Sequence, residues 1–100
     1  MDQDPERHLI SRQTARAYIE AWRKERKEHD VRSGHMDRAV IDRILAQPGC
    51  AGIRYYNARH PKGHDTVVLV GADKDGRALW DGAIAEEMVP CPPFCDPDDV

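Results

Sequence analysis

The chain has 100 residues and a net charge of -3, with 40% hydrophobic and 33% charged residues. A chain of this length forms one domain and buries somewhat over about 60% of its unfolded surface. The slightly acidic charge balance disfavours general nucleic-acid binding. The longest apolar run is residues 67–70, far below the roughly 20 residues of a membrane helix. We therefore expect one small domain and no membrane partner.

The N-terminal residues and the number of cysteines indicate a cellular compartment. Residues 1–6 are acidic and no apolar stretch follows them, so no secretory signal is recognised. The three cysteines are an odd number, which fits a reducing compartment better than a disulfide framework. These features predict a cytoplasmic protein.

Two amphipathic helices are predicted in the first half of the chain, after a polar arm at residues 1–10. The first runs from residue 12 to about 29, with Ser11 as its N-cap and a stripe of Ala15, Tyr18, Ile19 and Trp22. The second runs from residue 37 to 46, with Asp37 as its N-cap. Pro48 and Gly49 end it.

Strands are predicted in the second half. Residues 50–59 alternate as a half-buried strand does, residues 66–72 form the strongest strand, and residues 77–81 form a short third one. The turns lie at 60–65 and 73–76. Residues 82–88 form either a short helix or an extended segment, and the helix is favoured. Four prolines follow residue 89, which excludes helix or central strand there.

The predicted fold class is therefore α+β. Two N-terminal helices pack on a three-stranded antiparallel meander, since a small sheet needs an apolar partner. Residues 11–89 make up the domain and residues 90–100 a Pro/Cys-rich strap. The expected core consists of Trp22, Ile41, Leu45, Ile53, Tyr55, Val68 and Val70.

The strap contains the most distinctive motif, in which Cys91 and Cys95 are separated by two prolines and a phenylalanine. Thiolates are soft ligands that suit zinc, and Cys50 with His60 or His64 would complete four ligands. A zinc site is therefore one prediction, with Cys91, Cys95, Cys50 and either His60 or His64 as its ligands. Two alternatives stay open: the cysteines are small buried hydrophobes, or Cys91 and Cys95 pair oxidatively.

The sequence contains no recognisable set of catalytic residues. Cys50 follows a Pro-Gly turn and opens no helix, so no helix N-terminus activates it as a nucleophile. The acidic turn at residues 73–76 lacks the glutamate that a calcium loop requires at its twelfth position, where Ile84 stands. A basic patch lies near the end of the first predicted helix and is interrupted by acidic residues, which is typical of a solvated helix face. The basic residues are Arg23, Lys24, Arg26 and Lys27, and the acidic ones are Glu20, Glu25, Glu28 and Asp30.

Three segments resemble a group of small uncharacterised bacterial proteins. They are residues 47–56, with a Gly-Ile-Arg strand, residues 69–73, with a Val-Gly hairpin, and residues 90–95, with the Pro-Cys ending. The resemblance covers roughly residues 35–96. It implies a bacterial origin and a compact fold, and it carries no activity to transfer.

The sequence thus favours a non-enzymatic interaction module. A thin core and a small sheet with exposed edges invite pairing with another chain, most commonly in a symmetric homo-oligomer. An unknown protein partner is the other possibility for such a surface. A zinc-binding protein is the main alternative function, and a thiol redox protein is a weaker one.

Overall fold

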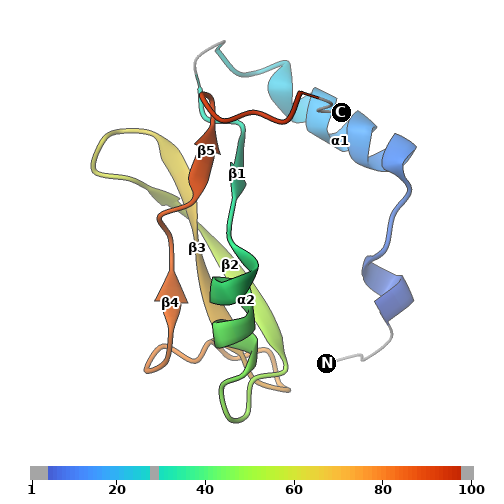
Figure 1. Cartoon of the computed structure of the whole chain (residues 1–100). Helices are drawn as coiled ribbons and strands as arrows, with labels where there is room; N and C mark the ends of the chain where they lie inside the picture. Colours follow the sequence, from blue (N-terminus) through green and yellow to red (C-terminus); the bar gives the residue numbers. More distant parts are fainter. Residues whose placement is uncertain (1–4, 28–29, 98–100) are drawn as a thin grey trace.

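The computed structural model describes residues 5–27 and 30–97, and it has the predicted α+β composition. These residues form a short 3-10 helix, two α-helices and five strands, four of which follow the last helix (Figure 1). In chain order the elements are η1 (Pro5–His8), α1 (Arg12–Arg23), β1 (Ser33–His35), α2 (Arg38–Leu45), β2 (Gly52–Arg59), β3 (Asp65–Ala72), β4 (Ile84–Ala85) and β5 (Val89–Cys91).

Helix α1 begins as predicted, because the Ser11 hydroxyl accepts a hydrogen bond from the Thr14 backbone N–H at 3.0 Å. It ends at Arg23, earlier than predicted. After it, the backbone N–H groups of Glu25 and Arg26 bond to carbonyls three residues earlier instead of four. The Asp30 carboxylate then accepts a hydrogen bond from the Lys27 N–H at 3.0 Å. Such side-chain acceptors compete with helical bonding. Residues 28 and 29, the last two of the predicted helix, lie outside the described residues.

Helix α2 is the one that packs on the sheet. It contacts both β2 and β3, and its Ile44 is fully buried. Asp37 occupies the N-cap position without a side-chain cap hydrogen bond and instead faces the His35 ring at 3.4 Å. Gly49 after the helix has φ +78°, a conformation that favours glycine. By contrast α1 buries no residue and stands apart from the sheet in Figure 1.

The main sheet has the order β2-β3-β4 and is antiparallel throughout. Strands β2 and β3 pair along their whole length, from Gly52 opposite Ala72 to Arg59 opposite Asp65. The third strand, β4, comes later than the predicted 77–81, which supply an isolated bridge between Ala72 and Ala78. A turn closed by the Gly82 N–H on the Leu79 carbonyl diverts the chain there. The short helix predicted at 82–88 was therefore wrong.

A second, two-stranded sheet was not predicted. Strand β1 pairs antiparallel with β5, with Ser33 opposite Cys91 and His35 opposite Val89. The Arg32 N–H extends this ladder by donating to the Cys91 carbonyl at 2.8 Å. The first residues of the predicted strap are thus held as a strand against the segment that links the two α-helices.

The core is smaller than the sequence predicted. The buried hydrophobic side chains among the described residues are Ile44, Val70, Ala72 and Cys91. Val70 was predicted correctly and Ile41 and Val68 are half-buried, but the predictions for Trp22, Leu45, Ile53 and Tyr55 were wrong, since all four are exposed. Among residues 5–27 and 30–97, no helix has both the length and the apolar character that crossing a membrane requires.

Candidate functional site

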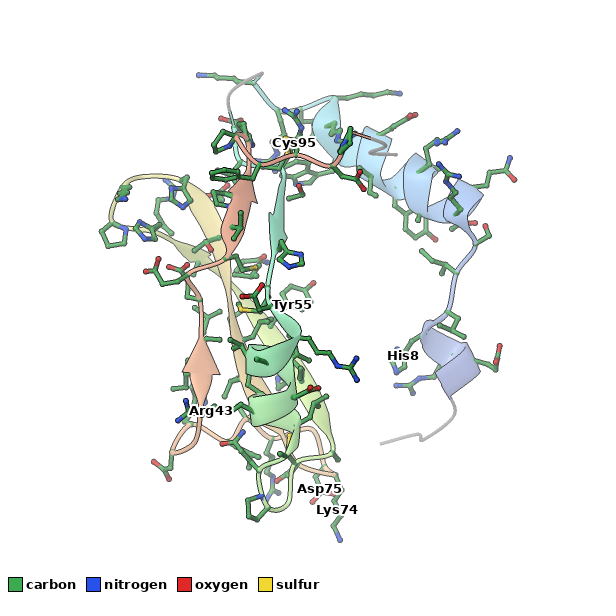
Figure 2. The ribbon with its side chains drawn as sticks, viewed as in Figure 1. His8, Arg43, Tyr55, Lys74, Asp75 and Cys95 are labelled. Carbon is green, nitrogen blue, oxygen red and sulfur yellow. A yellow bond between two sulfur atoms is a disulfide. The ribbon has the colours of Figure 1, made fainter. Side chains whose placement is uncertain are left out.

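The cysteines of the predicted zinc site lie at opposite ends of the molecule. Cys91 and Cys95 are joined by a disulfide, and Figure 2 shows Cys95 at the end opposite the turn of Lys74 and Asp75. Cys50 lies near that turn, where its thiol donates to the Gly52 carbonyl at 3.2 Å. The structure therefore does not bring the three sulfur atoms together.

The two histidines of the predicted set do meet. The rings of His60 and His64 stack with their centroids 4.6 Å apart, at the loop that joins β2 to β3. Cys50 precedes β2 and His60 follows it, and a strand of eight residues spans about 26 Å. Cys50 and the histidines therefore lie too far apart to share one ion in this fold, so the five predicted residues do not form a single site. Zinc binding by the reduced Cys91 and Cys95 stays a prediction.

Sequence analysis missed two glutamates that approach His60. The Nε2 atom of His60 lies 3.6 Å from a carboxylate oxygen of Glu86 and 3.6 Å from one of Glu87. The three ligand atoms lie within 4.8 Å of one another. No spacing rule connects position 60 with positions 86 and 87, because the segment after β4 brings them together.

A hydrogen bond at the other ring nitrogen of His60, Nδ1, shows which nitrogen carries the proton of the neutral ring. The backbone N–H of Lys62 donates to Nδ1 at 3.0 Å, so this nitrogen is an acceptor and the proton of the neutral ring is on Nε2. That N–H points toward the two carboxylates. The arrangement is thus a histidine donor facing paired acceptors, and a metal at Nε2 would have to displace the proton.

A groove of about 420 Å³ lies between the end of α1 and the two sheets. Trp22 and Arg26 line one side, and the guanidinium of Arg26 lies over the Trp22 ring at 4.3 Å. Arg26 also approaches the Asp65 carboxylate at 3.9 Å. The opposite side carries residues of β1, β3 and β5, including Ser33, Thr66, Val67 and Pro90. The lining mixes apolar, polar and charged side chains and so does not indicate one class of ligand.

Strand β2 is an open edge of the main sheet. Its residues 53–57 are all exposed. Of the large hydrophobic side chains there, Tyr55 is the most exposed, whereas Tyr56 still packs near Trp80, with ring centroids 5.1 Å apart. The His60 N–H bonds the His64 carbonyl at the loop, and on β3 the Gly71 carbonyl accepts from Leu79 on the far side. Antiparallel ladders alternate, so Ile53, Tyr55 and Asn57 direct their backbone groups away from β3.

The disulfide has an asymmetric environment. Cys91 is 1% exposed within β5, whereas Cys95 is exposed on the strap. A guanidinium nitrogen of Arg32 lies 3.7 Å from the Cys95 sulfur. The sequence pattern marked the two cysteines but not Arg32, which the pairing of β1 with β5 places beside them.

No protein-family model, curated protein or solved structure matches this chain. The bacterial origin implied by the resemblance of residues 35–96 stays a prediction. What the chain does must therefore be inferred from its own surfaces.

Proposed function

We propose that the chain is an interaction module that self-associates by pairing the β2 edges of two copies. The observation that carries the proposal is the run of exposed residues 53–57 on an eight-residue edge strand. Unpaired edges of this length template addition of another strand. A cytoplasmic location, inferred from the odd cysteine count, belongs to the same proposal.

The accessible surface of the chain is large enough to accommodate a partner. The chain exposes 7963 Å², whereas a compact monomer of 11.4 kDa exposes about 5,800 Å². The radius of gyration is 15.1 Å, against about 13 Å for a compact 100-residue domain. The excess of about 2,000 Å² exceeds the roughly 800 Å² that each partner hides in a standard interface.

The residues of β2 are compatible with two-fold pairing. With Tyr55 on the axis, Arg54 faces Tyr56 of the other copy, and Ile53 faces Asn57. An arginine opposite a tyrosine is favourable, and like charges are not opposed along residues 53–57. Arg54 already lies near the Tyr56 ring of its own chain, at 5.8 Å from the centroid. The two-fold pair extends this arrangement across the axis.

The test compares two tyrosines of nearly equal exposure. Tyr55 on β2 is 65% exposed and Tyr18 on α1 is 67% exposed. Tyr55→Lys sets two charges against each other at the axis, so the variant is expected to be a monomer with an unchanged circular dichroism spectrum. Tyr18→Lys is expected to stay a dimer. Sedimentation equilibrium of both variants and the parent reads the mass directly.

Two results would contradict the proposal. A parent chain that stays monomeric at hundreds of micromolar would remove self-association altogether. Dissociation by Tyr18→Lys but not by Tyr55→Lys would move the interface from the sheet edge to the exposed apolar stripe of α1.

The second candidate function is the binding of a divalent metal ion at His60, which the geometry there favours. Ligand atoms of a tetrahedral zinc site lie about 3.4 Å apart when each bond is about 2.1 Å, close to the 3.6 Å between Nε2 and each carboxylate. Binding would move the ring proton to Nδ1 and break its contact with Lys62. Both changes lower the affinity, and the bound metal would compete with protons.

Calorimetric titration with zinc chloride tests this candidate on the metal alone. Stoichiometric binding that Glu86→Gln weakens at least tenfold, and Glu20→Gln leaves unchanged, supports a site at His60. Binding that persists in Glu86→Gln but disappears on oxidation of the cysteines would instead place the ion at the originally predicted thiolates.

A further inference from the structure

The Cys91–Cys95 disulfide joins a fixed, buried sulfur to an accessible one. Cys91 is 1% exposed, and its backbone is held by the Arg32 N–H on its carbonyl at 2.8 Å. The Phe94 N–H donates to the Pro90 carbonyl at 3.0 Å, which folds the strap back over the end of β5. Cys95 is exposed at the other end of this turn. An incoming sulfur atom can therefore reach Cys95 but not Cys91.

Arg32 gives Cys95 a second property. Its guanidinium lies 3.7 Å from the Cys95 sulfur, and a positive charge beside a cysteine favours the thiolate, which is the reactive form. The contact depends on the fold, since Arg32 immediately precedes β1 and bonds Cys91 through its backbone. Asp96 follows Cys95 in the chain and acts in the opposite direction. The effect of Arg32 is therefore measured best by removing its charge alone.

We propose that Cys91 and Cys95 form a thiol–disulfide exchange site that acts on disulfides of other peptides or proteins. In the reduced chain the Cys95 thiolate attacks one sulfur of the substrate disulfide. The substrate bond breaks, its second sulfur leaves as a thiolate and takes up a proton, and Cys95 is held in a mixed disulfide. Arg32 is a positioning residue that favours the thiolate of Cys95.

Cys91 completes the exchange. Its thiol loses a proton to solvent and attacks the Cys95 sulfur, which forms the disulfide seen in the structure and releases the first substrate sulfur as a thiolate that is then protonated. The substrate disulfide gains two electrons and two protons. Both electrons come from the pair of cysteines, and the protons taken up from solvent match the one that Cys91 loses and the one that Cys95 lost when its thiolate formed.

Glutathione returns the pair to the reduced state in two steps, with the first attack at Cys95 because Cys91 is covered. One glutathione thiolate forms a mixed disulfide with Cys95 and releases Cys91 as a thiolate that is then protonated. A second glutathione attacks the glutathione sulfur of that mixed disulfide, so that Cys95 leaves as a thiolate and oxidised glutathione is released.

This inference is independent of self-association, since the β2 edge contributes nothing to it. It also reconciles the disulfide with the predicted reducing compartment, where disulfides are usually transient and catalytic or redox-sensing. The exposed Phe94 beside Cys95 offers an apolar surface to a peptide substrate.

The first test measures the alkylation rate of each cysteine in the reduced parent chain at pH 7, by iodoacetamide and peptide mass spectrometry. Cys95 is expected to react at least threefold faster than Cys50 and Cys91. Arg32→Gln is expected to slow Cys95 at least threefold. Arg43→Gln, which removes the same charge on α2 far from Cys95 (Figure 2), is expected to leave the rate unchanged. Equal rates for Cys95 and Cys50, or no effect of Arg32→Gln, would overturn the proposal.

The second test traps the intermediate with oxidised glutathione as the probe. The Cys91→Ser chain is expected to accumulate one glutathione on Cys95, whereas the Cys95→Ser chain forms the adduct on Cys91 at least tenfold more slowly. Adduct formation at equal rates on both variants would show that burial does not direct the exchange, and the assigned roles would be wrong. The alkylation test needs no cysteine substitution, so it decides even if Cys91→Ser does not fold.

Discussion

The side chain of Gln47 joins the end of α2 to the backbone of Ala83, 36 residues later in the chain. Its Oε1 accepts from the Ala83 N–H at 2.8 Å, and its Nε2 donates to the Ile44 carbonyl at 2.8 Å. Both bonds are partly buried. Through Gln47, α2 therefore fixes the segment that leads into β4, which has only two residues and little ladder of its own.

Gln47→Ala should destabilise the fold by about 1–2 kcal/mol, because partly buried backbone groups lose a partner. Gln13→Ala on the exposed face of α1 is the matched control, with an expected change below about 0.5 kcal/mol. Urea denaturation at a fixed protein concentration measures both. Equal effects for the two variants would mean that Gln47 does not hold the β4 segment.

Gly82 should be coupled to Gln47. A Cβ atom at Gly82 would overlap the Oε1 of Gln47, so Gly82→Ala must displace the carboxamide from Ala83. The substitution is expected to cost about 1 kcal/mol in the parent and close to nothing in the Gln47→Ala background, a coupling typical of residues in contact. Additive effects in the double-mutant cycle would contradict this link.

The turn at Asp73 predicts a specific pH dependence. The backbone N–H of Arg77 and that of Asp75 both donate to one Asp73 carboxylate oxygen at 2.9 Å. The bond from Arg77 is the largest cause that lowers the pKa of Asp73 below its ordinary value of 3.8. A carboxyl with a lowered pKa stabilises the fold above the unfolded value, and this contribution disappears as the pH falls through the folded value.

Thermal unfolding of the parent and of Asp73→Asn between pH 7 and pH 2 tests the prediction. The parent should be the more stable above pH 3.8, and the difference should shrink as acid protonates Asp73. Asp81→Asn removes the same charge outside the turn and corrects for the change in net charge. A difference that grows in acid would show that the turn does not hold the charged form.

Burial in the structure reverses the expectation for two isoleucines, since Ile53 was a predicted core residue and Ile44 was not. Ile44 is fully buried and Ile53 is exposed. Ile44→Val should therefore cost about 1 kcal/mol and Ile53→Val less than about 0.5 kcal/mol. Urea denaturation of each variant in the Tyr55→Lys background excludes any contribution of the proposed interface. A larger cost at Ile53 would mean that the core lies elsewhere.

Local signals in the sequence were sufficient for the elements that depend on local bonding. The Ser11 cap, the turn at residues 73–76, and both long strands were predicted close to their observed positions, because caps, glycine turns and alternation act over a few residues. Strand β4 and the β1–β5 pair were missed. Their formation depends on contacts such as Gln47 with Ala83 and Arg32 with Cys91, which no short window contains.

The core and the candidate sites show the same limit. Alternation in β2 predicted that Ile53 and Tyr55 face a core, but α2 is too short to cover the strand and α1 stands apart, so both side chains are exposed. The sequence identified Cys91 and Cys95 but not the guanidinium beside them. The sequence identifies the reactive side chains. Which charged side chains surround them depends on the long-range pairing of strands, as for Arg32 and Cys95.

The separation of α1 from the sheet leads to a last prediction. Because α1 buries no residue, Ala17→Pro should unfold that helix, at a cost of about 3 kcal/mol within it, without weakening the sheet. Amide hydrogen exchange of β2 and β3 should be unchanged, while the helical circular dichroism decreases. Asp42→Pro in α2, which contacts both strands, is the matched control and should speed exchange throughout the sheet. Faster exchange of β3 in Ala17→Pro would show that α1 supports the sheet after all.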